Sequence, residues 1–267
     1  MAVELQGARV LLTGATGGIG NAIARALHER GAHLIISGRR AEVLEELASE
    51  LGDRVEVKPA DLADIDAVRE LAESVGDVDV LVANAGLPGT GALGEYTREQ
   101  VDKVLAVNLN APVHLTHILL PKMQERGSGH LVYVGSISSK VATAWSSLYN
   151  GTKFGLRGFA FALHEELRGS GIGVTCVFPG PISDAGMWAD GGLDLPRGVS
   201  ARSPEQVAAA VIKGIETNKP EIDVAHPVMR LGGWLAGPAP RLIAAFNRRV
   251  GANETAERLS EAQKVKR

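Results

Sequence analysis

The sequence lacks the features that mark several classes of protein. Its 267 residues include one cysteine, Cys176, which excludes an internal disulfide, and its seven histidines are too scattered for a Cys/His metal site. Lys and Arg total 28 against 31 Asp and Glu, so the basic surplus of a nucleic-acid-binding protein is absent. No run of about 18 apolar residues occurs and the N-terminus has no signal-peptide pattern. We therefore expect a cytoplasmic protein with no transmembrane helix, no metal ion and no nucleic-acid partner.

Short apolar runs alternate with segments of helical periodicity along most of the chain. Hydrophobic residues make up 45% of the sequence, which is enough for a sizeable core. Val80-Leu81-Val82 is apolar on both faces, as central strands of a parallel sheet are. The alternation predicts an α/β fold, a Rossmann-type doubly wound parallel sheet in a single domain with helices on both faces. The seven expected strands are 9–13, 33–37, 55–58, 79–83, 130–135, 173–178 and 221–224.

A glycine-rich loop follows the first expected strand and precedes a helical pattern at 21–30. Glycines let the backbone turn tightly and approach an anion, and the N-terminus of the helix favours negative charge. Gly14, Gly18 and Gly20 fit Thr-Gly-x-x-x-Gly-x-Gly and not Gly-x-Gly-x-x-Gly. The position between strand and helix favours a phosphate-binding loop over a flexible loop without a ligand. The residues expected to bind there are Gly14, Thr16, Gly17, Gly18, Ile19 and Gly20.

Two arginines follow the second expected strand, where the adenosine ribose of a dinucleotide lies. An acid here would accept hydrogen bonds from NAD, whereas an arginine pairs with the 2′-phosphate of NADP. The chain has Gly38-Arg39-Arg40 and no acid, so we expect NADP(H), with Arg39 as the main contact and Arg40 as the lesser. Either arginine could instead be a solvated residue at a helix start. Further along, Asp61 and Leu62 are expected to contact the adenine, although an Asp that caps a helix is the alternative.

Tyr149 and Lys153 are four residues apart, so on a helix their side chains leave the same face. A phenol with a pKa near 10 is a poor acid–base group at neutral pH, and an adjacent ammonium lowers that pKa. The pair can therefore exchange protons under physiological conditions. The spacing alone is weak evidence, because a half-buried ring beside a solvated lysine has the same spacing.

Polar residues occur at three further points in apolar surroundings. Asn84-Ala85-Gly86 ends the fourth expected strand, and Ser136 follows the fifth. Asn108 lies in an apolar helical run that opens with a capping box at Thr97, and a buried asparagine needs partners. Pro112 lies inside that run, so we expect a kink there.

Together these motifs resemble the short-chain dehydrogenase/reductase family. The matching residues, in the family's order and at its intervals, are Thr13 through Gly20, Asn84-Ala85-Gly86, Asn108, Ser136, Tyr149, Lys153 and Pro179-Gly180. The resemblance covers roughly residues 5–225 and implies hydride transfer between a nicotinamide cofactor and a carbonyl or alcohol. We therefore divide the chain into a dinucleotide-binding catalytic domain at 1–225 and a C-terminal extension at 226–267.

The resemblance also implies residue roles. Tyr149 would protonate the carbonyl oxygen, Lys153 would lower the pKa of Tyr149 and hold the nicotinamide ribose, and Ser136 would donate a hydrogen bond to the substrate oxygen. Asn108 would hold a water that links Lys153 to solvent. Ser138 and Ser139 compete with Ser136, which lies at the family's interval of 13 residues before the tyrosine. The implied cofactor-binding set further includes Asn84, Ala85, Gly86, Tyr149, Lys153, Pro179, Gly180 and Ile182.

Two positions depart from the family pattern. Gly17 also satisfies the glycine spacing of the longer sugar-nucleotide epimerases, but the chain is short for that branch. Asp184 stands where the family often has a threonine that bonds the carboxamide, so the backbone of Ile182 is the safer expectation for that contact.

The substrate is expected to meet apolar residues. Leu87, Trp145, Pro181, Ile182, Met187 and Trp188 should surround the nicotinamide, which favours a hydrophobic ketone or aldehyde. Met187 and Trp188 could instead pack within a loop at 184–199, which is glycine-rich and is expected to be a substrate lid.

The stretch 226–250 mixes large apolar residues with Arg230, Arg241, Arg248 and Arg249. We expect it to pack over the substrate pocket or at a subunit interface, and contact with a membrane surface is the alternative. Family members are often dimers or tetramers, so we expect a homo-dimer or homo-tetramer.

The favoured function is an NADP(H)-dependent oxidoreductase acting on a small carbonyl or alcohol compound. A non-catalytic NADP(H) sensor needs the glycine loop but not Asn108, Ser136, Tyr149 and Lys153 together, so these four residues favour an enzyme. An epimerase-like enzyme is the second alternative, which tight cofactor retention without net oxidation would distinguish.

Overall fold

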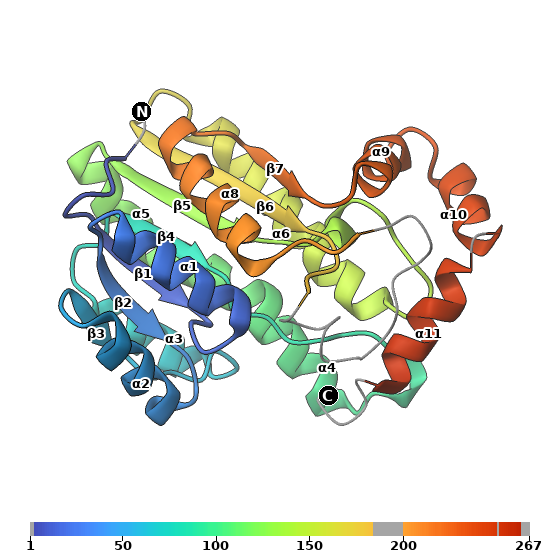
Figure 1. The fold of residues 1–267 in the computed structure, drawn as a ribbon, viewed down its shortest axis with the longest axis horizontal. Coiled ribbons are helices and arrows are strands. Elements are labelled where there is room, and N and C mark those ends of the chain that lie inside the picture. The colour runs from blue at the N-terminus through green and yellow to red at the C-terminus, as the bar shows by residue number, and fades with distance from the viewer. Residues whose placement is uncertain (1–2, 184–199, 250, 263–267) are drawn as a thin grey trace.

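The structure is a computed structural model that describes residues 3–183, 200–249 and 251–262 (Figure 1). It contains a seven-stranded sheet in the order β3-β2-β1-β4-β5-β6-β7, in which every neighbouring pair is parallel. The strands are β1 (Arg9–Thr13), β2 (His33–Ser37), β3 (Val55–Val57), β4 (Val80–Ala83), β5 (Gly129–Val134), β6 (Ile172–Pro179) and β7 (Glu221–Val224). The predicted doubly wound parallel sheet is confirmed.

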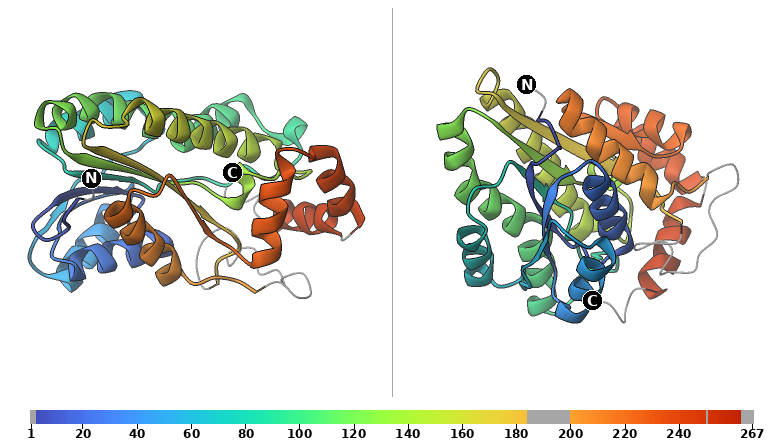
Figure 2. Two further views of the ribbon diagram at one scale, coloured as in Figure 1. Left: turned by 90° about the horizontal axis from the view of Figure 1, so that it is seen from above. Right: turned by 60° about the vertical axis from the view of Figure 1, so that its left-hand side comes forward.

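Helices cover both faces of the sheet in two layers (Figure 2, left). One face packs against α1 (Gly18–Glu29), α2 (Ala41–Leu51) and α8 (Pro204–Thr217). The other packs against α3 (Ile65–Ser74), α5 (Ala111–Arg126) and α6 (Ser147–Glu166), and α4 (Arg98–Leu105) lies beside α6. Alternate strand residues enter the two cores, as Leu12 does on one face and Leu11 on the other. This alternation is the period-2 geometry of a strand that is buried on both sides.

Capping residues set the starts of several helices. Thr97 with Gln100 begins α4, as the sequence predicts, and Ser203 with Gln206 begins α8. Each pair forms the reciprocal hydrogen bonds of a capping box. The first helix begins at Gly18, earlier than the predicted 21, because the glycine loop itself turns into the helix. The helix starts are therefore largely local properties of the sequence.

The predicted kink near Pro112 takes the form of a π-helix. Residues Ala106–Asn110 make one wide turn between α4 and α5, and Pro112 falls in the first turn of α5. The helical run continues through this point, so the proline removes one backbone hydrogen bond, and the wide π-helical turn accommodates that loss. The irregular turn therefore lies just before the proline, and it contains Asn108.

The helical run Arg98–Arg126 is long and apolar enough, by length and composition, to cross a membrane. In the fold, Leu115, Leu119 and Met123 of this run are buried against the sheet with the second core. Core helices of soluble proteins pass the same test of length and hydropathy, so the apolar face of this run is accounted for by packing.

Three further helices follow the sheet: α9 (Pro227–Ala236), α10 (Pro240–Arg249) and α11 (Ala252–Ala262). They lie beyond the carboxyl ends of the strands, at the end of the molecule where β6 and β7 finish (Figure 1). Single-turn helices precede α4 and α6, at Leu93–Glu95 and Ile137–Ser139. The predicted glycine loop, Asn84-Ala85-Gly86 and Ser136 follow β1, β4 and β5 at this carboxyl edge of the sheet.

His130 of β5 is fully buried, and burial lowers its pKa from 6.5 to about 3. Its Nε2 contacts Thr175 Oγ1 at 3.0 Å, and Nδ1 has no hydrogen-bond partner among the described residues. The ring lies over Gly173 of the neighbouring strand, where a Cβ would collide with Nδ1. The folded protein therefore holds this histidine neutral at pH values where the unfolded chain protonates it.

We expect acid to destabilise the fold through His130. Below pH 6.5 the unfolded chain binds a proton that the folded protein does not, so the free energy of unfolding should fall by about 2 kcal/mol between pH 7 and pH 5. His130→Gln keeps a polar group for Thr175 without the titration, and should lose about 2 kcal/mol less over that range. Urea unfolding at several pH values measures both slopes, and equal slopes would contradict the assignment.

Candidate active site

The glycine loop between β1 and α1 forms one wall of a cavity. Gly14 has φ +69°, and a Cβ there would lie 2.7 Å from Cα of Ala85. A Cβ on Gly20 would collide with the carbonyl oxygen of Gly14. Gly17 precedes α1 without a side-chain cap, so the first N–H groups of the helix have no side-chain partner there. Only glycine fits positions 14 and 20, and the cradle leaves backbone donors for an anion.

Asn84 and Ala85 join the end of β4 to this loop. Thr13 Oγ1 accepts hydrogen bonds from the backbone N–H groups of Asn84 and Ala85, each at 3.2 Å. Asn84 Nδ2 donates to the carbonyl oxygens of Thr13 and Gly14, each at 3.1 Å. The motif that was predicted to bind cofactor therefore also holds the glycine loop in place, which the sequence did not reveal.

The two arginines differ in their contacts, although both line the cavity. Arg40 donates from Nη2 to the carbonyl oxygen of Thr16 at 2.9 Å. Arg39 is exposed and makes no hydrogen bond or ion pair with any residue in the described ranges. A side chain at Gly38 would crowd Thr16, with its Cβ 3.2 Å from Thr16 Cγ2. Arg39 is thus the arginine whose guanidinium is available to an anion.

Asp61 and Leu62 lie on the same side of the cavity. Asp61 Oδ1 accepts from the N–H of Ala63 at 3.1 Å, which is a turn contact before α3. The residue that caps α3 is Asp64, so the alternative that Asp61 caps a helix is wrong. Leu62 is buried with the second core. Both remain candidates for the adenine end of a dinucleotide.

Helix α6 carries Tyr149 and Lys153 on its buried face, with exposed fractions of 8% and 3%. Lys153 Nζ lies 5.7 Å from the centroid of the Tyr149 ring. The same nitrogen donates a hydrogen bond to the carbonyl oxygen of Val134, at the end of β5, at 3.0 Å. The strand end and the helix therefore fix the ammonium beside the phenol.

Burial controls the protonation of both groups. It raises the pKa of Tyr149 to about 12, against a smaller lowering by the hydrogen bond with Ser136. Burial also lowers the pKa of Lys153 to about 8. The expectation that Lys153 lowers the pKa of Tyr149 below its ordinary value is therefore wrong for this arrangement, because desolvation of the phenolate raises that pKa.

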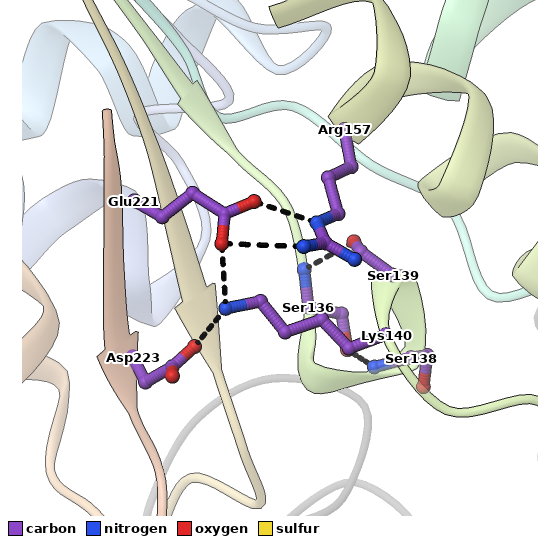
Figure 3. A network of polar contacts seen from close by, with 7 residues as sticks. All are labelled: Ser136, Ser138, Ser139, Lys140, Arg157, Glu221 and Asp223. Carbon is purple, nitrogen blue, oxygen red and sulfur yellow. Dashed lines mark hydrogen bonds and ion pairs between the residues drawn. The ribbon is translucent and has the colours of Figure 1, made fainter. Parts of the chain in front are cut away.

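Ser136 is the serine of its loop that interacts with the Tyr149 phenol. It begins the single helical turn Ile137–Ser139, and its Oγ accepts from the N–H of Ser138 at 3.1 Å. Ser139 Oγ accepts from the N–H of Ser136 at 3.2 Å and is fully buried (Figure 3). Of the three competing serines, Ser139 is thus committed to the loop, and Ser136 is placed beside Tyr149.

Asn108, in the π-helical turn, is buried and pairs with the backbone of Leu87. Its Oδ1 accepts from the N–H of Leu87 at 2.7 Å, and its Nδ2 donates to the Leu87 carbonyl oxygen at 2.9 Å. Gly86 lies between Asn108 and Lys153, where a Cβ would be 3.6 Å from Asn108 Oδ1 and 3.7 Å from Lys153 Nζ. Asn108 therefore anchors the loop after β4 next to Lys153, a role beyond the predicted water contact.

The cavity has a volume of about 1280 Å³. It is lined by every residue that was predicted to bind cofactor, and by Ser136 and Pro181 of the predicted substrate set. Trp145 of that set does not line it; this residue has φ 60°, is 36% exposed and accepts a backbone hydrogen bond from Gly91. Met187, Trp188 and the expected lid at 184–199 lie outside the described residues.

The far wall of the cavity comes from the three C-terminal helices. Apolar side chains line it: Val228, Leu231 and Leu235 from α9, Leu242, Ile243 and Phe246 from α10, and Leu259 from α11. Their spacing of three or four residues is that of amphipathic helices, which is the signal by which the sequence could have identified them. The cavity lined by the predicted cofactor-binding residues thus continues into an apolar compartment.

A buried ion network lies behind the Ser136 loop (Figure 3). Lys140 Nζ contacts Asp223 Oδ1 at 2.7 Å and Glu221 Oε2 at 3.0 Å, both on β7. Arg157 of α6 contacts Glu221 through Nε at 2.6 Å. Although burial opposes it, these cations hold the pKa of Glu221 below its ordinary value. The network ties the loop of Ser136 to the edge strand and to α6, and sequence reasoning missed it.

The comparisons with known proteins agree with this geometry. The family model of short chain dehydrogenases matches residues 8–193, and the chain belongs to this family of oxidoreductases. It is 34% identical to the ketoacyl reductase HetN of Nostoc over 82% of this chain and 79% of the relative. It is also 34% identical to the dehydrogenase/reductase SDR family member 7B of Bos taurus, over 98% of this chain and 86% of the relative.

Solved structures of the family have the same fold. A short-chain dehydrogenase from Sphingobium yanoikuyae in complex with NADPH superimposes with a TM-score of 0.77 and 26% identity, over 88% of this chain and 94% of that one. A serine dehydrogenase complexed with NADP+ gives 0.74 and 29% identity, over 82% and 95%.

We expect the ion network to contribute to stability through Lys140. Lys140→Met leaves Asp223 partly buried without this cation, so the free energy of unfolding should fall by about 3 kcal/mol. Adding Asp223→Asn removes the uncompensated charge and should recover part of that loss. Urea unfolding of the two single variants and the double variant measures the coupling, and strictly additive losses would contradict the pairing.

Proposed function

We propose that the protein transfers a hydride between NADP(H) and the carbonyl or alcohol group of a hydrophobic small molecule. The observation that carries the proposal is the meeting of Ser136, Tyr149 and Lys153 at the wall of a cavity that begins at the glycine cradle. A nicotinamide dinucleotide supplies the hydride chemistry when it is bound. The residues of the chain then bind and orient the substrate and move the proton.

The glycine cradle fits the phosphates of such a cofactor. Side chains at Gly14 or Gly20 would fill the space against the backbone, and the start of α1 offers N–H groups without side-chain partners. Lys153, fixed between Val134 and Tyr149, is suited to the nicotinamide ribose. These contacts would bring the nicotinamide to the part of the cavity that Tyr149 lines.

Tyr149 is suited to donate the proton in the direction of reduction. Burial keeps its pKa at about 12, so the phenol carries its proton at neutral pH. Ser136 shares a hydrogen bond with that phenol and can donate to the same substrate oxygen as charge develops on it. Lys153 can stabilise the phenolate that the proton transfer leaves.

The preference for NADP(H) rests on Arg39. Its guanidinium is exposed at the cavity without an ion-pair partner among the described residues, and no acid lies beside it in the sequence to repel a 2′-phosphate. The NADPH and NADP+ complexes of two structural neighbours support the same choice.

The substrate is expected to be apolar because the compartment beyond Tyr149 is. Leu231, Leu242, Ile243, Phe246 and Leu259 are among the residues that line it. Apolar walls favour a substrate that loses water contact on binding, with a few polar groups fixing its orientation. A ketone or aldehyde with an extended hydrocarbon part fits this compartment.

We expect Tyr149→Phe to abolish most turnover and to leave cofactor binding intact. Removing the proton donor should lower kcat by roughly 10²–10⁴-fold. NADPH consumption with a panel of ketones measures kcat, and fluorescence titration measures NADPH binding. Tyr133→Phe is the matched control, because it removes a buried hydroxyl that contacts Thr116 and does not line the cavity. Full activity of Tyr149→Phe would refute the proposal.

We expect Arg39→Ser to weaken NADPH selectively. Loss of a charge-assisted contact should lower kcat/KM with NADPH by roughly 10- to 100-fold and change kcat/KM with NADH little. Arg40→Ser should have the smaller effect, since Arg40 is already bonded to Thr16. Steady-state kinetics with the two cofactors tests this, and an equal loss with both would count against a 2′-phosphate contact.

A further inference from the structure

The exposed apolar surface of the protein is concentrated on α9 and α10. Of the ten large hydrophobic residues that are exposed in the described ranges, five belong to these two helices: Val228, Leu231, Trp234, Leu242 and Phe246. Trp234 is 74% exposed and Leu242 is 67% exposed, which exceeds the exposure of the other eight. An apolar patch of this kind on a folded protein marks an interaction site.

This apolar surface is continuous with the substrate compartment. Val228, Leu231, Leu242 and Phe246 are exposed and also line the cavity. The helices lie beyond the carboxyl ends of the strands, and both views place them at one end of the molecule (Figures 1 and 2). The mouth of the apolar compartment therefore opens through the same surface that exposes these side chains.

The charges on α9 and α10 have one sign. Residues 224–250 contain four arginines, Arg230, Arg241, Arg248 and Arg249, and no Asp or Glu. All four are exposed, and none of their guanidinium groups forms a hydrogen bond or an ion pair with a residue that the structure describes. When these four are taken from the 28 Lys and Arg residues of the chain, 24 basic side chains remain against 31 acidic ones. The cationic face therefore differs in charge from the rest of the protein. The acids of the following helix, α11, lie outside this stretch.

We propose that α9 and α10 form a docking face for an anionic lipid bilayer, through which an apolar substrate reaches the cavity. An amphipathic element with arginines beside Trp, Leu and Phe binds at the boundary between headgroups and acyl chains. Each arginine near an anionic surface adds to the attraction. Binding to the bilayer does not depend on the proposed reaction, whereas entry of the substrate by this route rests on it.

Charge favours a bilayer over a second copy of the chain. A two-fold contact through this face would bring the arginines of both copies together without acids to pair with them. An anionic surface instead neutralises all of them at once. An acidic protein would supply the same negative charge as an anionic bilayer, but its surface would have to cover the protruding side chain of Trp234. An indole ring with its polar N–H is instead suited to the interfacial region of a bilayer.

Sedimentation of the full-length protein with vesicles tests the proposal. We expect it to sediment with vesicles of phosphatidylcholine containing roughly one-third phosphatidylglycerol, and several-fold less with phosphatidylcholine alone or at high salt. Arg241→Glu with Arg248→Glu should weaken binding at least roughly tenfold. Lys213→Glu with Lys219→Glu, on and after α8, changes the charge equally at exposed positions elsewhere and should bind like the parent.

The apolar contribution is tested separately. Trp234→Ala should weaken vesicle binding several-fold, whereas Ile65→Ala, an exposed apolar residue of α3, should not. None of these substituted residues lines the cavity, so turnover of a short water-soluble ketone should be unchanged in every variant. That readout separates failure of docking from failure of the proposed reaction.

Any of four results would overturn the proposal. The parent protein would fail to sediment with the anionic vesicles, or the Arg241/Arg248 variant would bind as the parent does. Alternatively, Trp234→Ala would dissociate a dimer in size-exclusion chromatography while vesicles are not bound, which would assign the face to a second copy. Capture by an acidic carrier protein without vesicle binding would equally reject the bilayer.

Discussion

The site depends on the close approach of the carboxyl ends of β1 and β4. Gly14 packs against the backbone of Ala85 without room for a Cβ, and Asn84 hydrogen-bonds the two strand ends together. The chain leaves these neighbouring strands toward opposite edges of the sheet, so a crevice opens between their connections. The loops after β2, β5 and β6 begin at the same edge of the sheet, so their residues form further walls of the cavity around that crevice.

Burial in that crevice determines the chemistry that the tyrosine can perform. The same dry environment disfavours the phenolate of Tyr149 and the ammonium of Lys153, so it moves their pKa values apart, to about 12 and about 8. A protonated phenol suits reduction, in which a proton is given up. In the proposed reaction, oxidation of an alcohol would start from the phenolate, so it would depend more heavily on charge stabilisation by Lys153.

Local sequence signals predicted the strands, the capped helices and the glycine loop, because each depends on residues that are adjacent in the chain. The direction of the Tyr149 pKa shift was predicted wrongly, since burial is a property of the whole fold. The network of Lys140 was missed because its partner Asp223 on β7 lies 83 positions away, and no spacing rule joins the two residues. Trp145 was predicted to line the cavity because it is near Tyr149 in sequence. It has a left-handed backbone conformation in the fold and does not line the cavity.

The apolar wall of the cavity comes from helices after the sheet because the strands and their loops already have other roles. Strand residues such as Leu11 and Leu12 are already committed to the two cores, and the loops at the carboxyl edge carry the cofactor cradle and the polar residues. An apolar compartment must then be supplied by elements outside the sheet. Helices in that position cannot bury both faces, so the apolar residues that shape the compartment also reach the surface, and the four arginines around them favour a partner that is both apolar and anionic.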